Sequence, residues 1–366
     1  MWLSKKILVW LSGWVDSAVV AYLLKEKGYD VTAGFMINYI APEGEICPTL
    51  SDIEVAKQVA KYLDIPFFTF DYRDEYKEKV LNYMYETYKK WITPNPDIMC
   101  NSEIKFKVFL DEALSLWFDG VATGHYARIQ EKDLWSQKIY KLLKWLDSSK
   151  DQSYFLSWLS QHQLSRSLFP IWDLQKSEVR KIAIQAGLPN AQRKESQGIC
   201  FVWKIDMMDF LQKKIPHQTG DIVDIHGNIL GQHKGVWYYT IGQRKWLDVW
   251  GMPEAIFVMK KDIKNNILVV GYKEDTQLFS DNLYTEDIHF LWQKIYFPIH
   301  AHAKIRYRQA DQECKISVID DCKNLPWIIS WAKYHVQFIH PQRAIAPGQS
   351  IVFYDGDELW GSALIL

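Results

Sequence analysis

The stretch that decides the fold is Ile7-Leu8-Val9-Trp10-Leu11-Ser12-Gly13-Trp14-Val15-Asp16-Ser17, close to the start of the chain. An apolar run of strand length ends at a Ser-Gly pair, and apolar residues then recur at helical spacing. We therefore predict a strand, a tight turn and a helix. The start of such a helix offers unpaired backbone N–H groups and a partial positive charge, which together suit a phosphate group.

The side chains of this turn favour nucleotide chemistry. Ser12 and Ser17 carry hydroxyl donors, and Asp16 could hold a magnesium ion against the phosphates. No Gly-Lys-Ser/Thr sequence follows, so the turn is not a Walker loop. On this stretch alone, an ordinary strand–helix turn remains the alternative.

Length and composition predict an ordinary soluble protein. A chain of 366 residues is long enough for two or three domains, and its apolar and charged fractions, 48% and 24%, exclude disorder as the default. The net charge of −1 means that any nucleic-acid binding must come from local patches. Lys5-Lys6 before an apolar run faintly suggests a signal peptide, but Asp16 interrupts the run and no cleavage site follows. We expect a cytoplasmic monomer with no membrane partner.

The cysteines do not form a metal-binding pattern. The chain has five, Cys47, Cys100, Cys200, Cys314 and Cys322, with no Cys-x-x-Cys pair. A structural zinc site is therefore not expected. Cys47, Cys314 and Cys322 are interpreted as small buried hydrophobes.

Strands alternate with helices over the first half of the chain. We predict strands at 31–39, 65–70 and 120–123, and helices at 75–90, 103–116 and 177–187. Ser51-Asp52-Ile53-Glu54 reads as a capping box that opens a further helix. This alternation predicts a doubly wound parallel sheet, an α/β fold. Ligands collect at the carboxyl ends of such strands, where Ser12, Met36 and Gly124 fall.

The segment 93–101 contains two prolines, Pro94 and Pro96, and each proline disfavours helical geometry in the residue before it. We predict a stiff, exposed, polar loop there. In such a loop the thiol of Cys100 would be placed for thiolate chemistry, unlike a cysteine in the core.

The pattern changes beyond about residue 206. One short helix at 207–213 is followed by strands separated by turn signals such as His226-Gly227-Asn228 and Asp355-Gly356-Asp357. We predict three domains: an α/β domain at 1–205, a small β-rich linker domain at 206–277, and an all-β barrel at 278–366.

Seven motifs in chain order carry a resemblance to a known family. They are the Ser12–Ser17 turn, Thr93 to Asn101, Ala122-Thr123-Gly124-His125-Tyr126-Ala127, Lys150 to Leu156, Gly198-Ile199-Cys200-Phe201, Thr240 to Lys245, and Pro347-Gly348-Gln349-Ser350. The first resembles the SGGxDS loop of the ATP pyrophosphatases (PP-loop enzymes). Together the seven are similar to those of the tRNA-specific 2-thiouridylases, the MnmA family, over nearly the whole chain.

The resemblance implies a two-stage reaction on the wobble uridine of tRNA. ATP with magnesium adenylates O2 of the base, and a persulfide sulfur on Cys200 then attacks C2 while AMP leaves. Cys100 is implied as the partner cysteine and Asp97 as an acid or base, although Asp97 could equally be a turn former after Pro96. AMP is a good leaving group, so activation divides a difficult step into two easier ones. The sulfur would come from a persulfide donor.

The resemblance also implies two sets of binding residues. Those for ATP are Trp10, Leu11, Ser12, Gly13, Trp14, Val15, Asp16, Ser17, Met36 and Gly124. Those for tRNA are Asn95, Pro96, Asp97, His125, Lys150, Asp151, Gln152, Arg306, Tyr307 and Gln349. RNA loops are read by stacking, base hydrogen bonds and phosphate contacts.

A basic stretch, Lys304-Ile305-Arg306-Tyr307-Arg308, supports the tRNA assignment. It alternates basic and apolar residues, so a strand there would present its cations on one face. The alternative is a solvated strand face. The pairs Arg180-Lys181 and Arg193-Lys194 could line the same groove.

The chain has 17 Trp and only 18 Gly, fewer glycines than the roughly 7% of average usage. Trp10, Trp14, Trp91, Trp145 and Trp246 stand where the similar family has glycine, and we extend this to Trp117, Trp172, Trp203, Trp250 and Trp360. Certain lineages read UGA as glycine, so translating such a gene with UGA as tryptophan would produce this bias. We expect many of these residues to be glycines in the functional protein, because a phosphate-binding turn often needs a residue with positive φ.

Two other functions stay open. If the tryptophans are genuine, the chain could be a non-catalytic tRNA-binding relative whose phosphate loop has decayed. A different PP-loop adenylating enzyme, such as a GMP or NAD synthetase, would not need the Cys100 and Cys200 pair or the β-rich C-terminal half.

Overall fold

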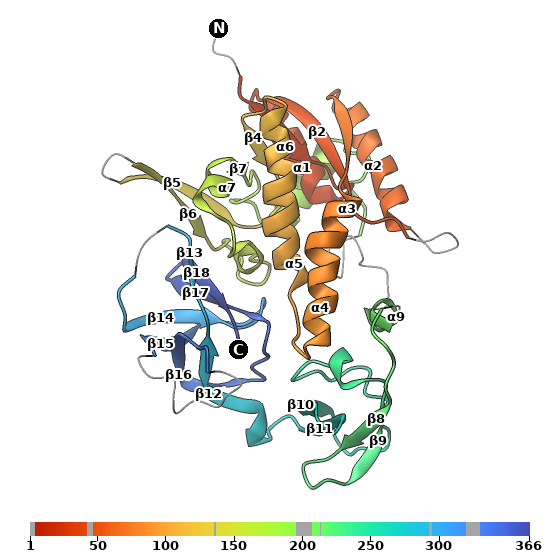
Figure 1. Ribbon diagram of the computed structural model, residues 1–366. Helices are drawn as coiled ribbons and strands as arrows, with labels where there is room; N and C mark the ends of the chain where they lie inside the picture. Colours follow the sequence, from red (N-terminus) through yellow and green to blue (C-terminus); the bar gives the residue numbers. More distant parts are fainter. Residues whose placement is uncertain are drawn as a thin grey trace.

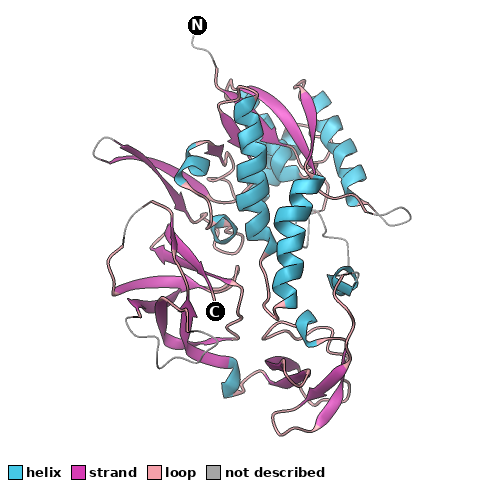
Figure 2. Cartoon of the chain, in the orientation of Figure 1, coloured by secondary structure: helices cyan, strands magenta, loops and turns pink. Residues whose placement is uncertain are grey.

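The computed structural model describes residues 4–41, 47–134, 137–194, 207–212, 214–292, 295–319 and 330–366. A parallel sheet with its helices forms the N-terminal part, and two further sheets follow it along the chain (Figure 1). Figure 2 shows the long helices gathered in the N-terminal part and strands dominating the rest. Within the described ranges, no helix combines the length and the apolar character that a membrane span requires.

The N-terminal sheet has the strand order β3-β2-β1-β4-β7, and all its neighbouring pairs are parallel. Its strands are β1 (Lys6–Trp10), β2 (Asp30–Ile37), β3 (Phe67–Asp71), β4 (Gly120–Ala122) and β7 (Ser167–Leu168). Side chains alternate between two apolar clusters, with Leu8 in one and Ile7 and Val9 in the other. Both faces of β1 are therefore buried, which explains why its sequence is a continuous apolar run.

Helices cover both faces of this sheet. The helices α1 (Val15–Glu26), α2 (Pro48–Tyr62) and α8 (Lys176–Gln185) pack in the cluster of Ile7 and Val9. The helices α3 (Arg73–Tyr76), α4 (Tyr83–Lys89) and α6 (Phe109–Ser115) pack in the cluster of Leu8. A π-helical stretch, Lys77–Asn82, joins α3 to α4. The predicted doubly wound α/β arrangement is confirmed.

The predicted capping box at Ser51 is wrong, because α2 begins three residues earlier. Pro48 takes the first helical position, where its missing N–H costs no hydrogen bond, and Cys47 is the N-cap. Ser51 therefore lies inside the first turns of the helix.

The predicted exposed loop at 93–101 is also wrong, because Thr93 and Pro94 are buried and the second half of the segment is helical. Pro96 opens α5 (Pro96–Met99), and a π-helical stretch, Cys100–Val108, continues it into α6. Asn95 has a non-helical backbone (φ −115°, ψ 88°), as expected for a residue before proline, and its side chain caps the helix by accepting from Ile98 N at 3.3 Å. The proline thus starts a helix instead of preventing one, and Cys100 lies within that helix.

A hairpin of the N-terminal half joins the C-terminal sheet. Its strands β5 (Arg128–Leu134) and β6 (Gln137–Leu143) are antiparallel, and β6 pairs with β18 near the end of the chain. The resulting order is β12-β16-β15-β14-β17-β18-β6-β5, with β13 also on β18. The remaining strands are β12 (Phe279–Thr285), β13 (His289–Phe290), β14 (Ile299–Lys304), β15 (Gln312–Val318), β16 (Tyr334–Arg343), β17 (Ser350–Asp355) and β18 (Glu358–Leu364).

The middle region is small and β-rich, as predicted. Its sheet has the order β10-β11-β8-β9, formed by β8 (Gly220–Val223), β9 (Ile229–His233), β10 (Ile256–Asp262) and β11 (Ile267–Tyr272). Short helices connect the larger elements: α7 (Gln161–Ser165), α9 (Met207–Gln212) and 3-10 turns at Ser153–Leu156, Val236–Tyr238 and Thr276–Leu278.

The expected strand at 304–308 is not formed. The strand β14 ends at Lys304, and the following residues form bends and turns. Lys304 is buried, with its ammonium group 3.5 Å from Asp151 and 3.6 Å from Asp311. The charge of Lys304 is therefore paired with two carboxylates inside the protein. The alternating pattern does not produce a row of exposed cations.

Candidate functional site

The turn after β1 is held by its two serines. Ser12 N donates to Ser17 Oγ at 3.2 Å, the two hydroxyl oxygens lie 3.1 Å apart, and Ser17 Oγ donates to Trp14 O at 2.9 Å. Gly13 has φ +82°, and a Cβ there would lie 2.5 Å from Asp52 O. Only glycine fits this position, because both its conformation and its closeness to α2 exclude a side chain.

The helix α1 begins at Val15 with no side chain capping its first turn. Its first N–H groups are therefore not satisfied by the N-cap residue, Trp14, whose φ of −92° is open to any amino acid. The positive φ of this turn lies at Gly13 and not at Trp14, so backbone strain does not argue for glycine at position 14. The geometry suits an anion at the start of a helix of 12 residues.

Three side chains that follow β7 in the chain contact this turn. Lys176 Nζ lies 2.6 Å from both oxygens of Asp16, and Tyr126 OH donates to the same carboxylate at 2.8 Å. Asn190 Nδ2 and Arg193 Nη1 each donate to Gly13 O at 3.0 Å. The sequence analysis missed Lys176 and Asn190, since a lysine at the start of a helix and an isolated asparagine carry no motif.

The described residues do not form a resident metal site. Both oxygens of Asp16 already contact the ammonium group of Lys176. No group of three or more metal-ligating side chains occurs within the described ranges. A magnesium ion held by the protein alone does not fit here, so magnesium is treated below as part of the nucleotide substrate.

Met36 lies at the carboxyl end of β2 and Gly124 just beyond that of β4, on the two sides of β1, as expected. A Cβ on Gly124 would lie 3.1 Å from Ser17 N, so this glycine lets the segment after β4 approach the start of α1. The side chain of Met36 is fully buried in the core. The backbone of Met36, and not its side chain, is therefore the part that could face a ligand at the end of β2.

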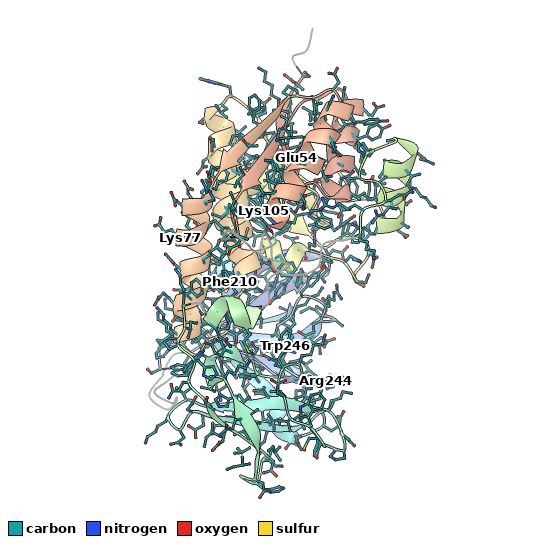
Figure 3. The ribbon with its side chains drawn as sticks, turned by 90° about the vertical axis from the view of Figure 1, so that its right-hand side faces the viewer. Glu54, Lys77, Lys105, Phe210, Arg244 and Trp246 are labelled. Atoms are coloured by element: carbon teal, nitrogen blue, oxygen red, sulfur yellow. The ribbon has the colours of Figure 1, made fainter. Side chains whose placement is uncertain are left out.

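His125 is buried beside the same strand ends and accepts or donates a hydrogen bond with Thr123 Oγ1 at 2.7 Å. Burial, together with the nearby charge of Lys105, lowers the pKa of His125 well below its ordinary value, so the ring is neutral at pH 7. Lys105 is itself buried, donates to Asn101 Oδ1 at 2.8 Å and lies 4.4 Å from the ring centroid of Trp10. Figure 3 labels Lys105 among the elements of the N-terminal part.

Cys100 is buried, with 1% of its surface exposed, and belongs to the apolar cluster of Leu8. This corrects the expectation of an exposed thiol in a polar loop, and the cause is the helix that Pro96 opens. Pro96 is buried, while Asn95 and Asp97 are half-buried at the start of that helix. Cys200 lies outside the described residues, so its pairing with Cys100 stays a prediction.

Three segments distant in the sequence meet near Asn95. Gln349 Nε2 donates to Thr93 O and Pro94 O, both at 3.0 Å. The hydroxyl oxygens of Thr93 and Thr240 lie 3.1 Å apart. The N-terminal, middle and C-terminal parts of the chain therefore share one junction, and three of the seven sequence motifs contribute to it.

Arg306 lies at this junction in a half-buried position. Its Nη2 donates to Ala344 O at 2.7 Å and to Ile241 O at 3.2 Å, which are neutral carbonyl partners. Tyr307 is also half-buried, with its ring centroid 4.5 Å from that of Phe155. Both residues belong to the predicted tRNA set.

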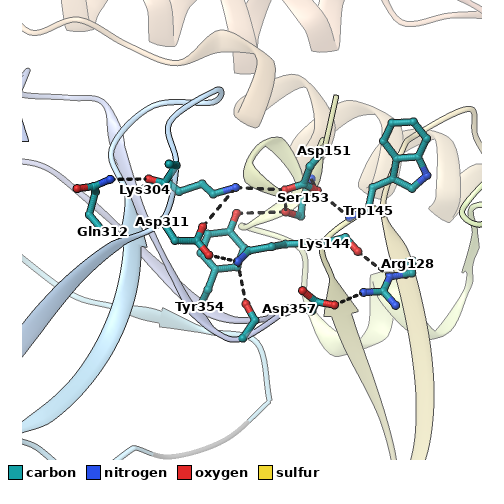
Figure 4. Close-up of polar contacts among 12 residues, drawn as sticks. Arg128, Lys144, Trp145, Asp151, Ser153, Lys304, Asp311, Gln312, Tyr354 and Asp357 are labelled. Carbon is teal, nitrogen blue, oxygen red and sulfur yellow. Dashed lines mark hydrogen bonds and ion pairs between the residues drawn. The ribbon is translucent and has the colours of Figure 1, made fainter. Parts of the chain in front are cut away.

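The motif Lys150-Asp151-Gln152 is only partly at the surface. Asp151 is 2% exposed and accepts from Trp145 N at 3.0 Å and from Ser153 N at 3.1 Å, besides its ion pair with Lys304 (Figure 4). Gln152 Oε1 accepts from Tyr126 N at 2.9 Å. The structure thus gives Asp151 and Gln152 internal partners, and Lys150 is the half-buried member whose charge lies nearest to solvent.

Comparison with known proteins matches almost the whole chain. Family models match residues 5–204 (tRNA methyl transferase HUP domain), 208–272 (tRNA methyl transferase PRC-barrel domain) and 280–365 (aminomethyltransferase beta-barrel domain). The expected succession of parallel sheet, small β-rich domain and C-terminal barrel is therefore confirmed.

Curated relatives align from end to end. The tRNA-specific 2-thiouridylase MnmA of Shouchella clausii is 44% identical over 363 residues, covering 98% of this chain and 96% of that protein. The protein of the same name from Staphylococcus aureus is 42% identical over 366 residues, covering 98% and 95%. A solved U34-tRNA thiolase NcsA from Methanococcus maripaludis is 19% identical with a TM-score of 0.35, covering 58% of this chain and 68% of that one.

Proposed function

Because the chain belongs to the tRNA-specific 2-thiouridylase family, we propose that it replaces O2 of the wobble uridine of tRNA by sulfur, at the expense of ATP. The observation that carries this proposal is the turn at the start of α1, which is built on Gly13 and lies beside Lys176 and Arg193, each ion-paired with an aspartate. An enzyme that activates a base oxygen needs such a site. The cytoplasm, where tRNA and ATP occur together, is the compartment that fits this reaction.

In the first step, the turn from Trp10 to Ser17 binds the phosphates of ATP. The N–H groups of the first turn of α1 and the hydroxyls of Ser12 and Ser17 donate to phosphate oxygens. Lys176 and Arg193 lie beside the turn in ion pairs with Asp16 and Asp52, and we expect phosphate oxygens to compete with these carboxylates for the two cations. Magnesium enters as part of the nucleotide. O2 of the uridine attacks the α-phosphorus, pyrophosphate leaves, and the base becomes adenylated.

In the second step, sulfur replaces the adenylate. The outer sulfur of a persulfide on Cys200 attacks C2, and the C2–O2 bond breaks as AMP departs with that oxygen. The thiolate of Cys100 then attacks the inner sulfur, which leaves the outer sulfur on C2 and a Cys100–Cys200 disulfide. Asp97, at the start of the same helix as Cys100, is the proposed acid or base.

Burial of Cys100 constrains this step. A thiol with 1% exposure cannot meet a persulfide unless neighbouring groups move. We therefore expect the tRNA base and the persulfide to reach Cys100 only after a rearrangement around the start of α5. A persulfide donor protein, a cysteine desulfurase or a relay carrier, supplies the sulfur to Cys200.

The tRNA surface includes the junction where Asn95, Arg306 and Gln349 meet, with Lys150 and Tyr307 beside it. This arrangement supports an RNA that touches all three domains. Because Asn95 and Asp97 begin the helix that carries Cys100, the wobble base lies at that end of the junction.

The direct test is thiolation of unmodified tRNA with ATP and a persulfide donor, followed by mass spectrometry of the nucleosides. We expect 2-thiouridine that depends on ATP. Cys200→Ser should lose this product while retaining tRNA-dependent pyrophosphate release. Sulfur transfer by Cys200→Ser would contradict the assigned role of Cys200.

One observation favours a second candidate, a non-catalytic tRNA-binding protein. The indole of Trp14 stacks on Arg193, with 4.2 Å between the guanidinium carbon and the ring centroid, and Trp10 lies against Lys105. Both rings occupy space beside the phosphate turn. Binding of tRNA without any pyrophosphate release would support this second function over the first.

A further inference from the structure

Two arginines of the C-terminal barrel lie close together at the three-domain junction. Arg306 follows β14 and Arg343 ends β16. Arg306 Nη2 donates to Ala344 O at 2.7 Å, and Ala344 directly follows Arg343, so the two arginines meet at the same end of β16. Burial, and then the charge of Arg343, lowers the pKa of Arg306, in agreement with this placement. Within the described ranges, the arginines that form ion pairs with carboxylates are Arg73, Arg128 and Arg193, and neither Arg306 nor Arg343 is among them.

Arg343 lacks the hydrogen-bond partners that a buried guanidinium requires. Its Nε and Nη2 atoms are buried and have no partner in the described part of the chain. Its guanidinium carbon lies 4.3 Å from the ring centroid of Phe257, so stacking offsets only part of the cost. Arginine stays protonated, and a buried donor that is left unpaired keeps the full cost of its lost hydration.

The middle domain leaves room for this pair. Gly242 has φ +82°, and a Cβ there would lie 3.1 Å from Arg306 Nη2 and 2.5 Å from Ala344 Cβ. A side chain at position 242 would therefore push the guanidinium of Arg306 away from its carbonyl partners. The Gly242 turn therefore leaves space for the guanidinium of Arg306 beside the chain that follows Arg343.

We propose that Arg343 and Arg306 together bind one phosphate group of the tRNA backbone, with Arg343 supplying the hydrogen bonds that it lacks in the free protein. The planar fork of arginine matches two phosphate oxygens at once. The site lies next to Gln349 and the turn before Asn95, so a phosphate there holds the RNA close to the catalytic helix. This inference rests on the proposed function for its polyanionic substrate.

The test measures tRNA affinity at several salt concentrations for the full-length protein. Arg343→Gln should weaken binding and reduce the slope of log K against log salt by about one unit, as expected for one lost phosphate contact. Arg343→Lys should keep most of the slope but bind more weakly, because lysine lacks the fork. The matched control is Arg73→Gln, which removes an exposed arginine that pairs with Asp71 at the end of the edge strand β3.

An unchanged slope in Arg343→Gln would overturn the inference and leave stacking on Phe257 as the role of this residue. Thermal unfolding of each variant shows whether the fold is retained. Failure of the wild-type chain to bind tRNA would contradict the proposed function as well. Binding by the wild type with an unchanged slope in Arg343→Gln would contradict the arginine site alone.

A second, independent observation concerns the tryptophans. Five helices of the N-terminal domain end with one hydrogen-bond pattern, in which two successive N–H groups bond back into the last turn. The first residue of each pair has positive φ: Gly28 (+81°), Asp64 (+48°), Trp91 (+67°), Trp117 (+65°) and Gly187 (+65°). Glycine, aspartate and tryptophan thus occupy equivalent positions, and aspartate tolerates the left-handed region better than a bulky residue does.

Packing does not explain tryptophan at positions 117 and 246, whereas the half-buried ring of Trp91 has its centroid 4.9 Å from that of Trp237. Trp117 is 85% exposed, and Trp246, in the middle domain (Figure 3), has φ +62° and is 57% exposed. A bulky residue in the left-handed region is a conformational outlier. By contrast, Trp360 is 2% exposed and its ring stacks on Phe353 at 5.0 Å, so it has the surroundings of a genuine tryptophan.

We infer that the natural protein carries glycine at positions 91, 117 and 246, encoded by UGA, and tryptophan at position 360, encoded by UGG. The test is to read these codons in the gene and to determine the masses of tryptic peptides of protein isolated from its native cells. Each peptide should be lighter by the difference between tryptophan and glycine at the first three positions, but not at position 360. UGG codons and tryptophan masses at 91, 117 and 246 would overturn this inference.

Discussion

Replacing Trp117 by glycine should stabilise the chain as written. Trp117 follows the last turn of α6 at φ +65°, where its N–H bonds to Leu114 O and the next N–H bonds to Ala113 O. A left-handed conformation costs a residue with a Cβ about 1–2 kcal/mol. Glycine has more conformational freedom in the unfolded chain, which reduces this stabilisation by about 0.5–1 kcal/mol. The side chain is 85% exposed, so little packing is lost.

The expected net gain is about 0.5–1 kcal/mol, or about 2 °C in the melting temperature of a domain of this size. It should be measured by urea and thermal unfolding followed by circular dichroism, since the substitution also removes a fluorophore. The matched control is Trp250→Gly, at a residue that is 89% exposed but is absent from the positive-φ positions. Equal destabilisation of both variants would refute the conformational argument.

Three further predictions follow from buried charged and thiol groups. Asp151→Asn should destabilise the protein by about 3 kcal/mol in thermal unfolding, because it breaks the buried ion pair with Lys304 and leaves that lysine with Asp311 as its carboxylate partner. In the same experiment the control Asp357→Asn, which removes an exposed partner of Arg128, should cost less than about 1 kcal/mol. Burial lowers the pKa of Lys261 from 10.5 to about 8, so the folded state binds fewer protons than the unfolded state between these values and stability should rise with pH there. Lys261→Met should abolish that rise and the exposed Lys264→Met should not, whereas a flat profile in the wild type would contradict the shifted pKa. With a thiol reagent at pH 8, the half-buried Cys47 should react before Cys314, because burial raises the pKa of the Cys314 thiol to about 12; rapid labelling of Cys314 in the folded chain would contradict its burial.

The elements that could be predicted from the sequence are those with local signals. The apolar run of β1 and the Ser-Gly pair after it predict the strand, the turn and α1, and Gly13 proves essential to that turn. Alternating strands and helices predict the parallel sheet, since a parallel pair needs a crossover. In the C-terminal half, short turn signals between apolar runs predict antiparallel strands, because a short turn can join two antiparallel strands directly.

The errors have identifiable physical causes. Pro96 was interpreted as a helix breaker, although proline fits the first position of a helix when the preceding residue caps it. The alternation at Lys304 and Arg306 suggested a strand face, but burial of Lys304 against Asp151 depends on a residue far away in the chain. No local pattern reports such a partner.

Contacts between domains were the least predictable feature. The pairing of β6 with β18 joins residues more than two hundred positions apart, and Lys141 and Glu358 form an ion pair across it. The same holds for Lys176 on Asp16, which becomes recognisable only once α8 packs against α1. The sequence motifs therefore predict which segments form the site, but the residues that contact those segments from distant parts of the chain are known only from the fold.

The most direct test of the central claim is to follow the oxygen that the sulfur replaces. A tRNA carrying a heavy oxygen isotope at O2 of the wobble uridine is incubated with the enzyme, ATP and a persulfide donor, and the AMP is analysed by mass spectrometry. Adenylation of the base followed by sulfur attack at C2 predicts that the heavy oxygen appears in AMP, in an amount equal to the 2-thiouridine formed. Formation of 2-thiouridine with unlabelled AMP, or release of labelled AMP without any 2-thiouridine, would contradict this account.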